Sequence, residues 1–402
     1  MVFSKPLYFD HQATTPVDKR VLEKMLPFLT ESCGNPHSTD HSVGWKMSQV
    51  IEDAKTNIAR LIGADPDEII FTSGATESNN LALLGLGRHQ TGGNRRRILV
   101  SAIEHKCILT IARILAEQYG YTIDLLPVDN KGRVSVSDLE NKLDDDVLFV
   151  SVMAVNNEIG TVQDIPTLSA TAKSAGAMFH CDAAQAPIAI NLQNYADTVD
   201  LISLSGHKML APQGIGALYI RRDLQTRIEP LLYGGGQQNG LRSGTLPVVL
   251  CAGMGAAADI LSTQETKTTR ENLRRLRNSF IAQLRELPWN ISLNGSADIE
   301  RHPGNANMCF HGFSAHDILQ VLQPHLAAST GSACTTGIPE SSHVLKAIGL
   351  SGGDAEASIR FSLGFDTINE DVTRAVGLIG NALERLDVTK QGGYQFQRRL
   401  AT

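Results

Sequence analysis

Three short stretches of the chain carry polar residues directly after runs of apolar residues. The first, "FTSGATESNN" (71–80), ends a strand-like run with a turn of small residues, and a helix is predicted to begin near Thr76. Free backbone N–H groups at a helix start, with the helix dipole behind them, can hold a phosphate. A tight turn before a capped helix fits the same letters equally well, so this motif alone does not decide between the two.

The other two stretches add an acid and a lysine. In "FHCDAAQA" (179–186), Asp182 follows a buried run, where it could cap a neighbouring helix or hold a cationic ring nitrogen. In "LISLSGHKML" (201–210), His207 and Lys208 follow another such run. A lysine is seldom buried without a partner or a chemical role, and one role is a Schiff base with a carbonyl cofactor. A phosphate cradle, an acid and a Schiff-base lysine are together what pyridoxal phosphate requires.

A cysteine lies in an unusual setting near the C-terminal end. In "STGSACTTGIPESS" (329–342), Cys334 is surrounded by small and turn-forming residues, which predicts an exposed, mobile loop. The other five cysteines (33, 107, 181, 251 and 309) occur in apolar or turn contexts and are interpreted as structural. No two cysteines form a Cys-x-x-Cys pair, so the pattern predicts neither a zinc site nor a disulfide framework.

Composition excludes several classes of function. The chain has 42% hydrophobic and 19% charged residues and a formal net charge of −6, which is typical of a soluble globular protein without a surface for nucleic acid or anionic membrane. No stretch approaches the roughly 20 apolar residues of a membrane-spanning helix, and the N-terminus lacks the apolar core of a signal peptide. The sequence therefore predicts a cytoplasmic protein with reduced thiols that binds neither nucleic acid nor membrane.

The elements that must position these residues follow from hydrophobic periodicity. Apolar residues recur at helical spacing over 43–62, which predicts a helix with one buried face. Helical segments then alternate with short apolar runs, which favours an α/β domain around a mostly parallel sheet. The runs are "EIIFTS", "RRILVSA", "YTIDLLPV", "VLFVSVMAV", "AMFHCDAA", "DLISLSG" and "GALYI". Ligands bind such sheets at the carboxyl ends of the strands, so the three polar stretches can converge there.

Beyond the predicted sheet, the polar stretch "STQETKTTR" (262–270) is interpreted as a hinge. A helix is predicted over 271–287, with its arginines on a solvated face, and a smaller α/β domain follows. The expected organisation is a large cofactor-binding domain over 15–262 and a small domain made of 1–14 and 263–402. The small domain carries the Cys334 loop, at about 329–342.

Five separated motifs give the chain a resemblance to a known family. They are, in order, "GATESNN", "VNNEIGTVQDI", "SGHK", "GGGQQNGLRSGT" and "STGSACTTG". With "YFDHQATTPVDKRVL" and "GNPHST" nearer the N-terminus, the chain resembles the pyridoxal-phosphate-dependent cysteine desulfurases of the housekeeping iron–sulfur type, which belong to the class V aminotransferases. The resemblance implies fold type I of the pyridoxal-phosphate-dependent transferases, in a homodimer with active sites at the subunit interface. It also implies conversion of L-cysteine to L-alanine, with sulfur passing through an enzyme persulfide to an acceptor such as an iron–sulfur scaffold protein.

The resemblance implies roles for the residues that match the motifs. Lys208 carries the internal aldimine, and Cys334 attacks the substrate sulfur. Asp182 pairs with the pyridine nitrogen, Gln185 donates to the phenolic oxygen, and His105 stacks on the ring and transfers protons. The remaining implied contacts are with the phosphate (Ala75, Thr76, Ser205, His207, and Thr245 of the neighbouring subunit) and with the cofactor and substrate carboxylate (Asn156 and, for the carboxylate, Arg360). No intrinsic metal is expected, although Cys334 could transiently ligate a nascent iron–sulfur cluster.

The chain departs from the family pattern at three places. Gln238 and Asn239 stand where members often have a charged pair, and Phe365 stands where an arginine is usual. The tail "GGYQFQRRLAT" (392–402) does not match the extended tail through which housekeeping members bind their scaffold. The first two departures leave the chemistry intact, whereas the third leaves the identity of the partner open.

Two kinds of alternative function remain at this point. Selenocysteine lyase, a kynureninase-like hydrolase or an aminotransferase would share the fold, but none of them needs the cysteine of "GSAC". A non-catalytic scaffold would share it too, but would have no reason to keep Lys208, Asp182 and His105 together. The destination of the sulfur, whether iron–sulfur clusters, tRNA or DNA, cannot be read from the residues.

Overall fold

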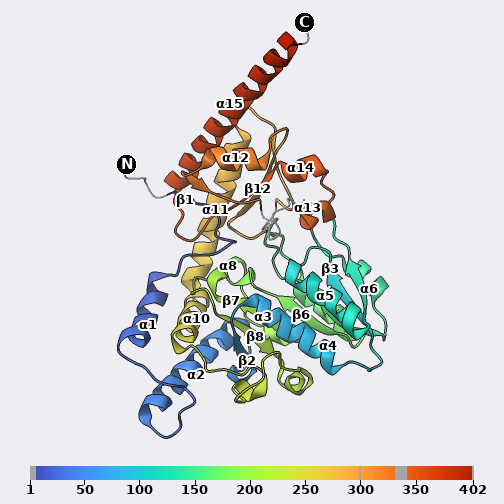
Figure 1. The fold of residues 1–402 in the computed structure, drawn as a ribbon, viewed down its shortest axis with the longest axis vertical. Coiled ribbons are helices and arrows are strands. Elements are labelled where there is room, and N and C mark those ends of the chain that lie inside the picture. The colour runs from blue at the N-terminus through green and yellow to red at the C-terminus, as the bar shows by residue number, and fades with distance from the viewer. Residues whose placement is uncertain (1–5, 298–299, 331–341, 401–402) are drawn as a thin grey trace.

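The computed structural model describes residues 6–297, 300–330 and 342–400 (Figure 1). Cys334 and most of the loop predicted at about 329–342 lie outside the described residues. Figure 1 shows the two main sheets one above the other, with α11 (Gln264–Arg285) running along both and α15 (Asn369–Leu400) extending away at the C-terminal end. Within the described ranges, no helix is long and apolar enough to cross a membrane.

The large sheet has seven strands in the order β2-β8-β7-β6-β5-β3-β4. They coincide with the seven predicted apolar runs: β2 (Ile69–Thr72), β3 (Arg97–Ser101), β4 (Thr122–Leu126), β5 (Val147–Ser151), β6 (Met178–Asp182), β7 (Leu201–Ser205) and β8 (Gly216–Ile220). Strand β8 is antiparallel to both of its neighbours, and the pairs from β7 to β4 are parallel. The prediction of an α/β fold around a mostly parallel sheet is confirmed.

Both faces of this sheet are covered by helices, which explains why its strands are continuous apolar runs. One face packs against α2 (Ser42–Ile62), α7 (Ile165–Ser174) and α10 (Val248–Leu261). The other packs against the segment formed by η2 (Asn80–Leu84) and α4 (Gly85–His89), and against α5 (Lys106–Tyr119). Helix α10 also packs against α1 (Lys19–Thr30). The predicted helix over 43–62 is confirmed as α2, which ends at Gly63 in the left-handed conformation.

A smaller antiparallel sheet lies in the C-terminal part of the chain, in the order β12-β10-β9. Its strands are β9 (Ile291–Leu293), β10 (Asn305–Phe310) and β12 (Ser358–Ser362). One face carries apolar side chains such as Met308 and Phe361 in the main core, and the opposite face carries Asn307 and Arg360. Strand β1 (Leu7–Tyr8) pairs with β11 (Leu326–Ala327), so the N-terminal segment lies beside the C-terminal part. The domain boundaries given above stay a prediction.

The remaining helices of the C-terminal part are short, apart from α11 and α15. They are α12 (Ala315–Leu322), α13 (His343–Ala347) and α14 (Gly352–Glu356). Helix α12 packs against α15, and α14 contacts both α13 and β10. The segment that contains Cys334 therefore lies between β11 and α13 in the chain.

Two details of the sequence interpretation are wrong. The predicted hinge at 262–270 is helical from Gln264 onward, because it contains no Gly or Pro and its polar residues tolerate an exposed helix. The arginines of α11 are also not all solvated. Arg277 is 1% exposed, and its guanidinium donates to the carbonyl oxygen of His302 and to Asn278.

Candidate active site

A cavity of about 810 Å³ lies at the carboxyl ends of β6 and β7, between the large sheet and the polar face of the small one. Most of the predicted site residues line it, namely Ala75, Thr76, His105, Asp182, Gln185, Ser205, His207, Lys208 and Arg360. Asn156 and Thr245 are not among the lining residues, and Cys334 is outside the described part of the chain. The structure thus brings together residues that are up to 285 positions apart in the sequence, from Ala75 to Arg360.

One end of the cavity is suited to an anion. Helix α3 (Ala75–Asn79) begins after Gly74, and its first intrahelical bond runs from the Ser78 N–H to the Gly74 carbonyl at 3.0 Å. The N–H groups of Ala75 and Thr76 precede that bond and need an acceptor from outside the helix. A Cβ at Gly74 would meet no atom within 4 Å, so the space in front of the helix is open. His207 adds a buried Nδ1 without a partner among the described residues.

A fixed carboxylate lies at the end of β6. Asp182 is buried, and its Oδ2 accepts a hydrogen bond of 2.9 Å from the Asn79 side chain. Its Oδ1 accepts one of 3.0 Å from the Ala184 N–H. Asn79 is three residues after Thr76, on the same side of the helical segment. The carboxylate is therefore held in one orientation, as recognition of a single protonated nitrogen requires.

The Lys208 amine is prepared for nucleophilic attack. Lys208 ends a turn of 3₁₀-helix that directly follows β7, and it lines the cavity. Burial lowers its pKa from the ordinary lysine value, and the charge of Asp182 only partly opposes this. Among the described residues, no hydrogen bond or ion pair engages its Nζ. A lysine that loses its proton more easily and has no partner can attack a carbonyl carbon.

His105 lies at the start of α5 and contacts a cysteine that was interpreted as structural. Its Nδ1 accepts from the Cys107 N–H at 3.2 Å and lies 3.0 Å from the Cys107 Sγ. Burial lowers the pKa of His105 and raises that of Cys107 to about 12. The ring is therefore neutral near pH 7, with its proton assigned to Nε2, and the neighbouring sulfur remains a thiol. Cys107 lines the cavity, which its apolar sequence context did not indicate.

Arg360 is already engaged by a carboxylate of this chain. Its Nη2 lies 2.6 Å from Asp10 Oδ1 and 2.8 Å from Ser329 Oγ. Its Nη1 donates to the Asn157 carbonyl oxygen at 2.9 Å, and its buried Nε has no partner among the described residues. The Arg360 guanidinium therefore binds a carboxylate at the wall of the cavity, and in this structure that carboxylate belongs to Asp10.

Asn156 and Thr245 occupy other environments. Asn156 is fully buried, its Nδ2 donates to the Ile103 carbonyl oxygen at 3.0 Å, and its Oδ1 accepts from the Glu158 N–H at 2.8 Å. Its neighbour Asn157 lines the cavity instead. Thr245 is exposed in a segment distant from the lining residues in sequence, and its expected contact across a subunit interface stays a prediction. The same holds for the expected contacts of Asn156.

A second buried acid lies beneath the site. Glu104 is fully buried, its Oε1 accepts from the Met153 N–H at 2.6 Å, and its Oε2 has no partner among the described residues. Burial, and secondly the charge of Asp182, raise the pKa of Glu104 well above the ordinary value. Burial thus disfavours the charged form of Glu104, and Asp182, unlike Glu104, lines the cavity. In the sequence, only the position of Glu104 immediately before His105 indicated that this acid lies near the site.

Comparisons with known proteins agree with this geometry. The sequence model of the family Aminotransferase class-V matches residues 7–375. "Cysteine desulfurase IscS" of Rickettsia akari is 43% identical over 385 residues, which cover 95% of this chain and 92% of that protein. A solved "NifS-like protein" superposes with a TM-score of 0.87 at 32% identity, covering 94% of this chain and 99% of that one. A solved "SspA in complex with cysteine" superposes with a TM-score of 0.77 at 34% identity, covering 90% and 99%.

Proposed function

The chain belongs to the class V aminotransferase family and, within it, to the pyridoxal-phosphate-dependent cysteine desulfurases of the IscS type, and we propose that the cavity around Lys208 is its active site. The enzyme converts L-cysteine to L-alanine and takes the sulfur as a persulfide. One observation carries the assignment of the site. A lysine amine without a partner among the described residues, a fixed carboxylate and two helix N–H groups that need an acceptor line the same cavity.

The groups that line the cavity fit pyridoxal phosphate in chemistry and number. Lys208 would bind its carbonyl carbon, Asp182 its ring nitrogen and Gln185 its phenolic oxygen. The phosphate would take the open N–H groups of Ala75 and Thr76, and it would give the unpartnered His207 Nδ1 an acceptor or donor. When bound, the cofactor withdraws electrons from the α-carbon of an amino acid.

We assign two further tasks to this chain's own residues. His105 keeps a proton on Nε2 because the Cys107 N–H occupies its Nδ1, so its neutral ring can stack and donate. Arg360 binds the carboxylate of L-cysteine, which replaces Asp10. Asp10 then holds the guanidinium in position when no substrate is present.

The role of Arg360 predicts a change in substrate affinity. In Arg360→Lys, we expect KM for L-cysteine to rise about 10- to 100-fold, because a hydrogen bond between two charged groups contributes about 1.5–3 kcal/mol and lysine cannot form the bidentate pair. The cofactor absorbance should not change. Steady-state kinetics check this, with Arg20→Lys on the exposed surface of α1 as the matched control. An unchanged KM would show that Arg360 does not bind the substrate carboxylate.

The lowered pKa of His105 predicts the acid side of the pH profile. A pKa below the ordinary histidine value of 6.5 means that more than half of the rings are neutral at pH 6.5 and that half-protonation is reached only below that pH. At saturating L-cysteine, kcat should therefore decline on the acid side with a midpoint below pH 6.5. His105→Gln should lose this decline along with most of the activity. A decline with its midpoint above pH 6.5, or one that persists in His105→Gln, would contradict the assignment.

We also propose that the enzyme is a homodimer. Exposed apolar side chains lie on α1 and at the start of α2, including Leu26, Leu29 and Trp45, and Tyr233 adds a fourth. Exposed large hydrophobic residues favour a subunit interface where they form one patch. The exposed position of Thr245 leaves it available to reach a partner's phosphate, as the family pattern implies.

The destination of the sulfur is proposed from the relatives. We propose a cytoplasmic role in iron–sulfur cluster assembly with a scaffold protein as acceptor, as the resemblance to the housekeeping type implies; the relatives are named cysteine desulfurases. Incubation of the enzyme with L-cysteine, with measurement of alanine and sulfide, tests the activity. Capture of proteins that acquire the labelled persulfide sulfur tests the acceptor. Alanine formation without sulfur transfer to a scaffold would retain the desulfurase and remove the proposed partner.

A further inference from the structure

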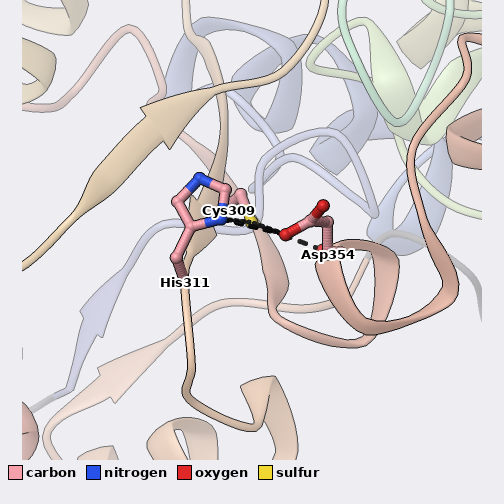
Figure 2. Close-up of side chains that lie close together, drawn as sticks. All are labelled: Cys309, His311 and Asp354. Atoms are coloured by element: carbon pink, nitrogen blue, oxygen red, sulfur yellow. Dashed lines mark hydrogen bonds and ion pairs between the residues drawn. The ribbon is translucent and has the colours of Figure 1, made fainter.

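Three side chains with metal-binding atoms lie together outside the cavity. Figure 2 shows Cys309 near the end of β10, His311 just after it and Asp354 on α14 pointing toward one another. The Cys309 Sγ lies 3.6 Å from the His311 Nδ1 and 3.8 Å from the Asp354 Oδ1, and the Nδ1 and Oδ1 are 2.9 Å apart. Among the described residues, this is the one group of three such side chains with this proximity.

The arrangement is convergent and does not form a proton relay. In a cysteine–histidine–aspartate relay, the thiol and the carboxylate contact different ring nitrogens. Here the same nitrogen, Nδ1, faces both the sulfur and the carboxylate oxygen. The other nitrogen, Nε2, lies 2.8 Å from the Ser292 Oγ. Three ligand atoms that face one point are the arrangement that a metal ion needs.

The distances fit a tetrahedral ion. Zinc lies about 2.3 Å from a cysteine sulfur and about 2.0 Å from a histidine nitrogen or carboxylate oxygen, which places the ligand atoms about 3.3–3.6 Å from one another. Of the three observed separations, 3.6 Å lies within that range, 2.9 Å lies below it and 3.8 Å lies above it. Shifts of a few tenths of an ångström would therefore complete the geometry.

Two of the ligands are held by hydrogen bonds at their far sides. Ser292 fixes the His311 ring through Nε2, and the Ser351 hydroxyl donates to the Asp354 Oδ2 at 2.8 Å, which leaves Oδ1 for the ion. Such outer partners are the usual companions of metal ligands. Cys309 is 1% exposed, whereas the side chains of His311 and Asp354 are 32% and 40% exposed, so an ion and a water can enter from their side.

We propose that Cys309, His311 and Asp354 bind one zinc ion, with water as the fourth ligand. A thiolate and an imidazole select a borderline-soft ion such as zinc, whereas calcium and magnesium take oxygen ligands. On binding, Cys309 loses its thiol proton to solvent and the neutral His311 ring carries its one proton on Nε2, which faces the Ser292 Oγ, while bonds from the Cys309 sulfur, the His311 Nδ1 and the Asp354 Oδ1 to zinc form. No change of oxidation state is involved.

The zinc site is separate from the active site but lies on the same sheet face. In the β10–β12 ladder, Cys309 pairs with Ser358 and Asn307 pairs with Arg360. Because alternate residues share a face, the sulfur lies about 7 Å along the strands from the register of Arg360. None of the three ligands lines the cavity. The ion would join α14 to the end of β10, so zinc should raise the melting temperature in proportion to the logarithm of its concentration above Kd.

Cobalt(II) titration tests the site. The chelator-treated holoenzyme of full length, in a Cys334→Ser background that removes the thiol of the 331–341 segment, is titrated with Co²⁺ without L-cysteine. Tetrahedral cobalt has intense ligand-field bands in the red, away from the absorption of pyridoxal phosphate. We expect these bands to saturate at one ion per chain and to disappear on addition of one equivalent of Zn²⁺.

Three variants and one control make the result specific. Cys309→Ser should remove the bands, and Ser292→Ala should lower the affinity about 10- to 100-fold, as loss of an outer partner does. Asp354→Asn, on an exposed side chain, should lower it at least as much and keeps the test valid if Cys309→Ser does not fold. Cys33→Ser, at an exposed cysteine, should change nothing. Absence of tetrahedral bands at one equivalent of Co²⁺, or their persistence in Cys309→Ser, would overturn the proposal.

Discussion

Replacing Lys208 by alanine should abolish both the visible absorbance of bound pyridoxal phosphate and the formation of alanine from L-cysteine. The amine lines the cavity without a hydrogen bond to any described residue, and its lowered pKa prepares it for attack on a carbonyl carbon. Asp182 and the N–H groups before α3 would remain, so weak non-covalent binding of the cofactor can persist. Because a variant that lacks a central catalytic group retains little turnover, we expect a loss of at least about 10⁴-fold.

Folding should survive this substitution. Burial already disfavours the charged form of Lys208, so its removal takes away an unfavourable charge along with some packing. Circular dichroism and the melting temperature should match those of Lys46→Ala, an exposed lysine on α2 that serves as the control. A borohydride-reducible adduct of pyridoxal phosphate that persists elsewhere on the Lys208→Ala chain would show that another lysine carries the cofactor.

The large sheet was predictable because its strands are buried on both faces. Runs such as "VLFVSVMAV" (147–155) contain almost no polar residue, so both their existence and their type can be read directly from the sequence. Parallel strands then place their carboxyl ends along one edge, which is why Asp182 and Lys208 were expected to meet. The structure places both on the wall of one cavity, together with Ala75.

Contacts that depend on how the two sheets are placed could not be predicted in this way. Asp10 and Arg360 are 350 residues apart, and no local pattern connects them. Cys107 lies among apolar residues in the sequence, yet its sulfur lies next to the His105 ring, because α5 begins at the cavity. Asn79 could have been found, since it follows Thr76 at helical spacing within a quoted motif.

The predicted hinge and the zinc site show two different limits of sequence patterns. Polar residues without Gly or Pro, as in 262–270, are compatible with an exposed helix as well as with a hinge, and tertiary packing of α11 decides between them. The proposed zinc ligands were not identified from the sequence, because a search for paired cysteines does not detect a Cys-x-His pair. Cys309 lies near the end of β10 and His311 one residue beyond it, and the third ligand lies 45 residues beyond Cys309.

The second prediction with a large expected effect concerns the cysteine that carries the persulfide. Cys334 lies outside the described residues, but described residues on both sides of its segment line the cavity. Ser329 and His343 line that cavity, and the Ser329 Oγ lies 2.8 Å from Arg360. Five residues of chain span at most about 17 Å, so chain length alone keeps Cys334 within that distance of Ser329, and we expect its thiol to reach a substrate bound at Arg360. Cys107 lines the cavity, but burial raises its pKa to about 12, which disfavours the thiolate that a nucleophile needs.

Cys334→Ser should therefore keep the cofactor absorbance and its change on addition of L-cysteine, because neither needs this thiol. It should form almost no alanine and carry no persulfide, since a serine hydroxyl cannot accept sulfur in this way. Tethering explains the size of the effect. Lowering the pKa of a free thiol from about 8.5 to about 7 raises reactivity only about threefold once the lost nucleophilicity is counted. Holding two sulfurs together is worth an effective concentration of about 10⁵ M or more.

Alanine and protein-bound sulfane sulfur are the quantities to measure, with Cys33→Ser as the control that should keep full turnover. A lyase that eliminates sulfide directly, or an aminotransferase, makes the opposite prediction, because neither reaction uses a protein thiol. Near-normal alanine formation by Cys334→Ser would therefore exclude the persulfide route, even with Lys208 and Asp182 placed as they are. Loss of alanine with an intact cofactor spectrum would leave transfer of sulfur to Cys334 as the step that the substitution removes.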